Sequence, residues 1–236
     1  IQSFDQLPIV IDKNSNPKFV ESVRFFVGDT HEVIEIDRWE PVRVGHLFNI
    51  TAPAYEPYQS HSLSNMRSTD YFSRFSPYVF KLVRGEACSR GVKSENRKNI
   101  YLKRRTASNL RGVDNADEIE AMLVDIGFDI VEPERLSFEE QVILFKNAEV
   151  VVSPVGAALA NMVFMSESSS VIAFAGCYED GNYSYYANLA SVLGIRFSYV
   201  VGDIVQKNRH PMHQDYTIKL DDVKKMLWLD GNDGCL

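Results

Sequence analysis

The second half of the chain alternates between two patterns of apolar and polar residues. Short continuous apolar runs predict strands at residues 100–102, 128–131, 149–153, 170–175 and 196–201. Apolar residues at helical spacing predict intervening helices at residues 115–126, 137–145, 159–164, 183–193 and 221–228. The run at 149–153 is apolar on both faces, which is typical of a central parallel strand. Because strands and helices take turns along this stretch, we predict a doubly wound parallel sheet.

Polar residues at the starts of two predicted helices form capping-box patterns. These are Asn115 with Glu118, and Ser137 with Glu140. In such a pattern the first side chain accepts from backbone amides of the helix, and the glutamate reaches back to the capping residue. Gly127 is well placed to end the first of these helices.

Residues 1–98 follow a less regular pattern. Apolar runs predict strands at residues 9–11, 33–36 and 42–50. Helices are expected at residues 18–27 and from Ser76, with Pro77 at the first helical position. Residues 89–98 are polar and basic, which indicates a linker. We therefore predict a smaller, incomplete or truncated α/β domain over residues 1–92, followed by a complete Rossmann-like domain over residues 93–229.

Length, composition and charge narrow the classes of function. The 236 residues suffice for one large or two small domains, and 45% hydrophobic with 24% charged residues is typical of globular proteins. The net charge of −7 argues against a nucleic-acid partner, which needs a broad basic face. No apolar run approaches the roughly 18 residues that span a bilayer, so we expect no transmembrane segment in this chain.

The residues that commonly hold metals or nucleotides form none of their usual motifs. Cys88, Cys177 and Cys235 are too widely spaced for a disulfide framework or a zinc site, which indicates free thiols in a reducing compartment. The sequence has no Asp-x-Asp triplet and no helical histidine pair, so we expect no metal site. It also lacks the glycine-rich and lysine motifs of NAD-binding and P-loop proteins, so we expect no cofactor of either kind.

Two loops at predicted strand ends carry residues suited to an anionic ligand. Ligands of open parallel sheets bind beyond the carboxyl ends of the strands, near the point where the strand order reverses. The first loop carries four cations that could neutralise a diphosphate: Lys103, Arg104, Arg105 and Arg111. In the second, residues 153–161, small side chains leave backbone amides open to phosphate. A solvated charge run and close helix–sheet packing are the respective structural alternatives.

These motifs together resemble glycosyltransferase family 61, which includes bacterial capsule-biosynthesis enzymes and eukaryotic xylosyl- and N-acetylglucosaminyltransferases. The similarity spans residues 100–165 in order and continues more loosely to residue 201 and weakly into residues 30–50. It rests on Arg104-Arg105, Arg111, Asn115, Glu118, Gly127-Phe128, Pro133-Glu134, residues 137–141 and residues 156–161.

The resemblance implies a GT-B-like architecture, in which two Rossmann-like domains face each other and the C-terminal one holds a nucleotide-sugar. It implies inverting, metal-independent transfer from a nucleotide-sugar, with a UDP-sugar as the expected donor, to a glycan or polysaccharide acceptor. The donor-binding residues that it implies are Arg104, Arg105, Arg111, Asn115, Glu118, Pro154, Gly156, Ala157, Ala158, Leu159 and Asn161.

The sequence departs from the family pattern at two positions. Val155 replaces the family's histidine before the Gly-Ala turn, and Ala173 stands where a glutamate is often found in the next strand. These departures keep open a catalytically degenerate relative that binds nucleotide or glycan, and an unrelated Rossmann-like scaffold that binds a protein is a third alternative. The family residues that remain intact favour the enzyme: Arg105, Arg111, Asn115, Glu118 and Asn161.

The catalytic base has no clear candidate in the sequence. The family's upstream histidine-containing stretch is not found after Ile1, which favours a truncated first domain. The local candidates are Asp29, His31, His46 and His61. We expect a cytoplasmic protein, free or at a membrane surface, or a lumenal one if it is eukaryotic.

Overall fold

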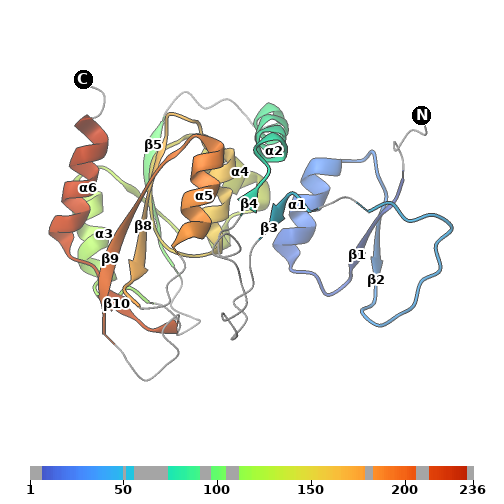
Figure 1. The fold of residues 1–236 in the computed structure, drawn as a ribbon, viewed down its shortest axis with the longest axis horizontal. Helices are drawn as coiled ribbons and strands as arrows, with labels where there is room; N and C mark the ends of the chain where they lie inside the picture. Colours follow the sequence, from blue (N-terminus) through green and yellow to red (C-terminus); the bar gives the residue numbers. More distant parts are fainter. Residues whose placement is uncertain are drawn as a thin grey trace.

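The computed structural model describes residues 7–49, 52–55, 74–90, 97–104, 112–178, 183–205 and 213–232. Its main feature is a six-stranded sheet in the order β10-β9-β8-β7-β5-β6 (Figure 1). All neighbouring strands are parallel except β10, which runs antiparallel to β9. The strands are β5 (Lys98–Leu102), β6 (Asp129–Val131), β7 (Ala148–Pro154), β8 (Ser170–Gly176), β9 (Arg196–Ile204) and β10 (Tyr216–Thr217).

Helices cover both faces of this sheet. The helices are α2 (Pro77–Arg90), α3 (Ala116–Asp125), α4 (Phe138–Lys146), α5 (Ser184–Leu193), α6 (Leu220–Asn232) and the 3₁₀ helices η4 (Pro133–Arg135) and η5 (Ala157–Phe164). Alternate residues of one strand serve different cores: Ile100 and Leu102 pack with α2, α4, η5 and α5, whereas Tyr101 packs with α3 and α6. The predicted α/β fold with a largely parallel sheet is therefore confirmed, with β10 as an antiparallel addition at its edge.

The strand order places a crevice between β5 and β7. From β5 the chain passes through α3 to β6 at one edge, then returns through α4 to β7 on the other side of β5. The paired residues Ile100↔Val151 and Tyr101↔Val152 show that the two strands end side by side. Their onward connections lead in opposite directions, so their carboxyl ends form the switch point at which parallel sheets bind ligands.

The N-terminal part is a single βαβ unit. It comprises β1 (Ile9–Asp12), α1 (Pro17–Val27) and β2 (Val33–Ile36), and the two strands are parallel. This unit contacts the larger one through aromatic rings, with the ring centroids of Phe25 and Phe138 5.3 Å apart. A short antiparallel pair, β3 (Ala54–Tyr55) with β4 (Arg74–Phe75), lies between the two units in Figure 1.

Helix α2 packs on the larger sheet, although it falls within the predicted first domain. Ala87 is fully buried in the core formed with α4, η5 and α5. Arg84 donates to the backbone oxygens of Leu193, at 2.8 Å, and Val163, at 3.2 Å. The boundary near residue 92 remains a prediction, but the packing joins α2 to the C-terminal unit.

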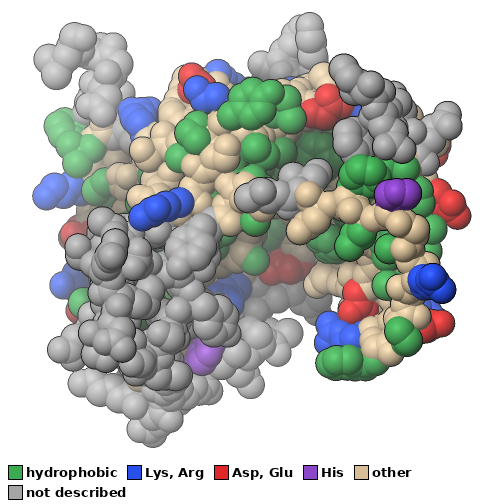
Figure 2. Space-filling view, turned by 45° about the vertical axis from the view of Figure 1, so that its right-hand side comes forward, with side chains coloured by type: hydrophobic (Ala, Val, Ile, Leu, Met, Phe, Trp, Pro, Cys, Tyr) green, Lys and Arg blue, Asp and Glu red, His purple; other side chains and the backbone are tan. Residues whose placement is uncertain are grey.

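The strand predicted at residues 42–50 is wrong, since residues 42–49 form no strand. Val42 and Val44 are 51% and 48% exposed, and β2 pairs only with β1 among the described residues. Apolar alternation does not make a strand without a neighbouring edge and a face to bury. Apolar side chains instead reach the surface of the βαβ unit (Figure 2), with Trp39 94% and Leu47 77% exposed.

The linker predicted at residues 89–98, the strand predicted at 100–102 and the helix predicted from residue 159 differ from the structure in their boundaries or helix type. Helix α2 continues through Arg90, and β5 begins at Lys98, so only residues 91–97 of the expected linker lie between them. The segment predicted as a helix from residue 159 is a 3₁₀ helix that begins at Ala157.

Only one of the two predicted capping boxes forms. The Ser137 hydroxyl accepts from the Glu140 amide at 3.1 Å, and the Glu140 carboxylate accepts from the Ser137 amide at 2.7 Å. The box predicted at Asn115 and Glu118 is wrong, because the Asn115 side chain bonds the backbone of Ile218. Its Nδ2 donates to the Ile218 oxygen at 2.8 Å, and its Oδ1 accepts from the Ile218 amide at 3.0 Å.

Candidate functional site

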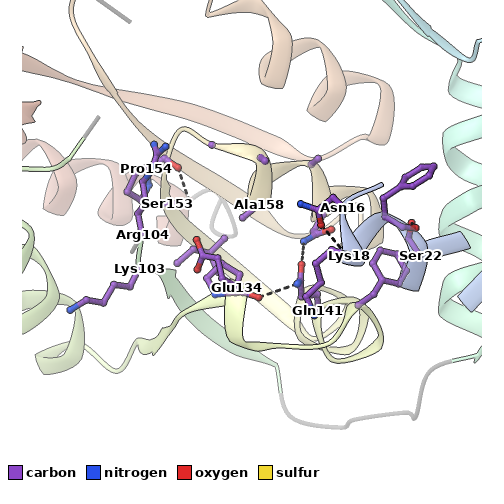
Figure 3. A pocket seen from close by; sticks show the side chains of 18 residues that line it. Asn16, Lys18, Ser22, Lys103, Arg104, Glu134, Gln141, Ser153, Pro154 and Ala158 are labelled. Atoms are coloured by element: carbon purple, nitrogen blue, oxygen red, sulfur yellow. Dashed lines mark hydrogen bonds between the residues drawn. The ribbon is translucent and has the colours of Figure 1, made fainter. Parts of the chain in front are cut away.

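A cavity of about 720 Å³ opens where β5 and β7 end (Figure 3). It lies between the larger sheet and the start of α1, and the space-filling view shows the surface hollowed between the two units (Figure 2). Its described lining residues are Asn16, Lys18, Phe19, Ser22, Leu102, Lys103, Arg104, Pro133, Glu134, Phe138, Gln141, Ser153, Pro154, Gly156, Ala157, Ala158, Ala160 and Asn161.

Two cations follow β5 at the edge of this cavity, but they have different partners. Lys103 forms a 2.7 Å ion pair with Glu120 of α3, and the hydrogen bond that its ammonium donates to this carboxylate raises the pKa of Lys103. Arg104 instead donates to the backbone oxygen of Val155, at 3.4 Å. The Arg104 guanidinium therefore bridges the ends of the two central strands, while the Lys103 charge is offset by a carboxylate.

Hydrogen bonds to β8 and α5 hold the turn after β7 in place. The Val155 amide donates to the Phe174 oxygen at 2.8 Å, and the Tyr186 hydroxyl donates to the Gly156 oxygen at 2.6 Å. Among the described residues, a Cβ atom added to Gly156 would meet only the Pro154 oxygen, at 3.8 Å, and Arg104 Nη1, at 4.0 Å. The absent side chain thus leaves space in front of the turn through which a ligand can approach the backbone.

Gly156 also precedes the first turn of η5, and no described side chain caps this helix start. Uncapped amides at a helix start carry partial positive charge and favour an anion. The side chains of Ala157 and Ala158 are too small to shield these amides from the cavity. The turn and Arg104 together form a wall suited to negative charge.

A chain of amide hydrogen bonds orients Asn161 at the other side of the cavity. Gln141 Nε2 donates to the backbone oxygens of Pro133, at 3.0 Å, and Leu136, at 3.3 Å. Its Oε1 must therefore accept, and it receives a 2.7 Å hydrogen bond from Asn161 Nδ2. This sequence of donors and acceptors fixes which end of the Asn161 amide is the oxygen.

Helix α1 provides the opposite wall. Asn16 caps it, with its Oδ1 accepting from the Lys18 amide at 2.9 Å. Glu21 accepts from the Lys18 ammonium at 3.0 Å and from the Phe138 amide at 2.8 Å, and these hydrogen bonds lower the pKa of Glu21. Glu21 thereby ties α1 to the first residue of α4, so the two walls of the cavity are joined.

The structure brings together six of the donor-binding residues expected from the sequence. Arg104, Pro154, Gly156, Ala157, Ala158 and Asn161 all line the cavity. Leu159 is a fully buried residue of η5, while Asn115 and Glu118 belong to the start of α3 and do not line the cavity. Arg105 and Arg111 lie outside the described residues.

None of the described candidates for a catalytic base lines this cavity. Asp29 and His31 lie in the turn between α1 and β2, and His31 Nδ1 lies 2.9 Å from the Leu7 oxygen. His46 lies in the exposed segment after β2, and His61 is outside the described residues. The roles proposed for all four remain predictions.

The two departures from the family pattern occupy apolar surroundings. Val155 is partly buried against the core that contains α2, α4 and α5. Ala173 is fully buried within β8. Neither position presents a polar group to the cavity.

Sequence reasoning missed the wall formed by Asn16, Lys18, Phe19 and Ser22. Their spacing predicted only a helix, because the approach of α1 to η5 is a tertiary contact. Glu134 and Gln141 were part of the motifs that carry the family resemblance, but no role was assigned to them. The position of Glu134, a polar residue just after a predicted strand, was the signal that could have identified it.

The described residues provide neither a group of metal ligands nor a membrane-spanning helix. Within the ranges that the structure describes, no group of three or more His, Cys, Asp or Glu side chains could hold a metal ion. No described helix is long and apolar enough to cross a membrane. Cys88 and Cys177 are free thiols, and Cys235 lies outside the described ranges.

The fold and the cavity define an α/β protein with an anion-suited crevice at the switch point of a parallel sheet. The family model Glycosyltransferase 61 matches residues 26–172, which is more than half of the chain. The chain therefore belongs to glycosyltransferase family 61 and is a glycosyltransferase. The matched segment includes both sides of the crevice, from β5 to the end of the turn after β7. No curated protein matches the chain.

Proposed function

We propose that this glycosyltransferase moves a sugar from a nucleotide-sugar, a UDP-sugar, to a glycan or polysaccharide acceptor. The transfer inverts the configuration at the anomeric carbon and needs no bound metal. The observation that carries the proposal is the cavity at the switch point, where Arg104 and the open turn at Gly156 face the same space. This is where a nucleoside diphosphate would find charge and backbone amides together.

The leaving diphosphate gains negative charge as its bond to the sugar breaks. Preorganised donors aimed at such charge lower the barrier, since they cost no reorganisation during the reaction. The Arg104 guanidinium and the amides after Gly156 are these donors in the proposal, and Arg105 and Arg111 would add to them. Lys103 contributes less, because Glu120 already offsets its charge.

The proposed architecture is GT-B-like, with the βαβ unit on the acceptor side and the larger sheet on the donor side. Its support is the cavity itself, which draws its lining from α1 on one side and from β5, α4 and η5 on the other. In this arrangement a sugar held at the donor side meets its acceptor between the two units.

The free thiols of Cys88 and Cys177 favour the cytoplasm as the location of the protein.

Calorimetric titration with UDP, GDP, CMP and TDP, each with EDTA present, tests the proposal. We expect micromolar binding of UDP and weaker binding of the other three. EDTA is also expected to leave sugar transfer intact. Loss of sugar transfer in EDTA, with recovery on addition of manganese, would contradict the metal-free mechanism. The absence of binding by all four nucleotides would contradict the donor assignment.

One alternative is supported by a specific observation. Val155 and Ala173 place apolar side chains where the family pattern has histidine and glutamate. A relative that binds nucleotide or glycan without transferring sugar would have lost such groups. Nucleotide binding together with no turnover of any donor would favour this alternative over transfer.

A further inference from the structure

We propose that Glu134 is the general base that accepts the proton of the acceptor hydroxyl. This assignment rests on the proposed function, because only an inverting transfer requires such a base in this cavity. It concerns a residue for which the sequence motifs gave no role.

Glu134 is the one carboxylate among the described residues that line the cavity, and no histidine is among them. In the view of Figure 3 it lies between Arg104 and Gln141, below the turn that carries Ala158. It therefore lies between the groups assigned to the leaving diphosphate and the side of the cavity that faces α1.

The backbone that carries Glu134 is held firmly. Pro133 is buried, and its oxygen accepts from both Gln141 Nε2, at 3.0 Å, and the Leu136 amide, at 3.2 Å. The preceding carboxylate, Glu132, is paired with Arg135 at 2.7 Å. Glu134 is exposed, and no described residue forms an ion pair or hydrogen bond with its carboxylate. A fixed backbone with an uncommitted carboxylate suits proton transfer to a bound ligand.

Two of the other candidates, Asp29 and His31, lie at the end of the βαβ unit that is remote from the cavity. The cavity is lined by the start of α1, which follows the carboxyl end of β1. Asp29 and His31 come after the other end of α1, and its 11 residues span about 16 Å. Asp29 and His31 therefore lie far from the start of α1, and His46 does not line the cavity.

The proposed step balances as a single displacement. The acceptor oxygen bonds to the anomeric carbon as its proton passes to a Glu134 oxygen. The bond between that carbon and the diphosphate oxygen breaks, and its electron pair leaves with the diphosphate, beside Arg104. The negative diphosphate bound in the same cavity favours movement of the acceptor's proton to the Glu134 carboxylate, so donor binding assists the transfer.

The test compares Glu134→Gln with the wild-type protein and with Glu139→Gln, an exposed carboxylate of α4 that does not line the cavity. The probes are UDP and a panel of UDP-sugars, with water as the acceptor and UDP release as the readout. We expect Glu134→Gln to lower the rate about 100-fold or more, and to bind UDP and the donor within about threefold of wild type. Glu139→Gln should retain the wild-type rate.

A rate for Glu134→Gln within tenfold of wild type would overturn the assignment. Donor affinity that falls while UDP affinity is kept would also overturn it, since Glu134 would then hold a sugar hydroxyl. If the wild-type protein binds none of the nucleotides, the proposed function fails and this assignment fails with it.

Discussion

The Glu21 carboxylate of α1 accepts a 2.8 Å hydrogen bond from the backbone amide of Phe138, the first residue of α4. The Phe138 ring also packs edge-on against Phe25 of α1, with centroids 5.3 Å apart. One polar and one apolar contact therefore join the βαβ unit to the larger sheet at the same residue. They hold together the two walls of the cavity.

The pH dependence of stability follows from this contact. Hydrogen bonds from Lys18 and then from the Phe138 amide lower the pKa of Glu21 from its ordinary value of 4.5. A carboxylate with a lowered folded-state pKa stabilises the protein above its unfolded-state pKa, and this stabilisation is lost as the pH falls through the folded-state pKa. The free energy of unfolding, measured by urea titration, should therefore decrease as the pH is lowered below about 4.5.

The variant Glu21→Gln should flatten this acid dependence. Glu140→Gln should flatten it further, because the Ser137 amide lowers the pKa of Glu140 in the same way. A Glu21→Gln protein whose acid dependence matches the wild type would show that the contact with Phe138 does not contribute to stability.

Arg104→Ala should weaken UDP binding. A hydrogen bond to a charged group contributes about 1.5–3 kcal/mol, which is about ten- to hundredfold in Kd. Arg104→Lys should recover part of this loss, since it keeps the charge without the bidentate geometry. Calorimetry measures both, with Arg43→Ala in the exposed segment after β2 as the control. Unchanged UDP affinity in Arg104→Ala would remove this arginine from the diphosphate site.

Arg105→Ala and Arg111→Ala test the part of the site that lies outside the described residues. The family resemblance implies that both arginines contact the diphosphate. Each substitution should reduce nucleotide affinity by about 1–3 kcal/mol. Unchanged affinity in both variants would contradict the assignment of this loop.

Gly156→Leu should block the cavity without unfolding the protein. The added Cβ atom meets no atom of the described residues closer than 3.8 Å, so the side chain is expected to extend into the ligand space. UDP affinity should fall more than tenfold, while the free energy of unfolding stays within about 1 kcal/mol. Gly45→Leu, on an open surface, is the matched control and should change neither quantity. Full UDP affinity in Gly156→Leu would place the ligand elsewhere.

Asn115→Ala should affect stability more than binding. It leaves the amide of Ile218 without its acceptor, and Ile218 is only 1% exposed. We expect a loss of about 1–3 kcal/mol in the free energy of unfolding. Asn115→Asp, which keeps the acceptor, should lose less. Weaker UDP binding with unchanged stability would instead support the donor-binding role that the family resemblance implies.

The elements predicted correctly are those whose signals are local. Residues 149–153 are apolar on both faces because β7 lies between two neighbouring strands with a core on each side. Ser137 and Glu140 cap α4 through contacts within a single turn. Arg104 and Gly156 could be expected near each other because both follow strands that end at the same edge of a parallel sheet.

The elements predicted wrongly depend on partners distant in sequence. Asn115 has the spacing of a cap, yet its amide bonds Ile218, which is 103 residues away. Residues 42–49 have the alternation of a strand but no neighbouring strand in the described structure. The wall supplied by α1 depends on the contact between Glu21 and Phe138, which the spacing of residues along the chain does not encode.

The position of the crevice at the switch point makes ligand binding dependent on long-range folding. Arg104 and Gly156 come together only after the chain between them has built β6, α4 and β7 and crossed back beside β5. An unfolded or half-folded chain cannot hold a ligand between them. A nucleotide bound at this point should therefore stabilise the folded state relative to the unfolded chain. At about 100 times its Kd it would add about 2.7 kcal/mol to the stability of the native state.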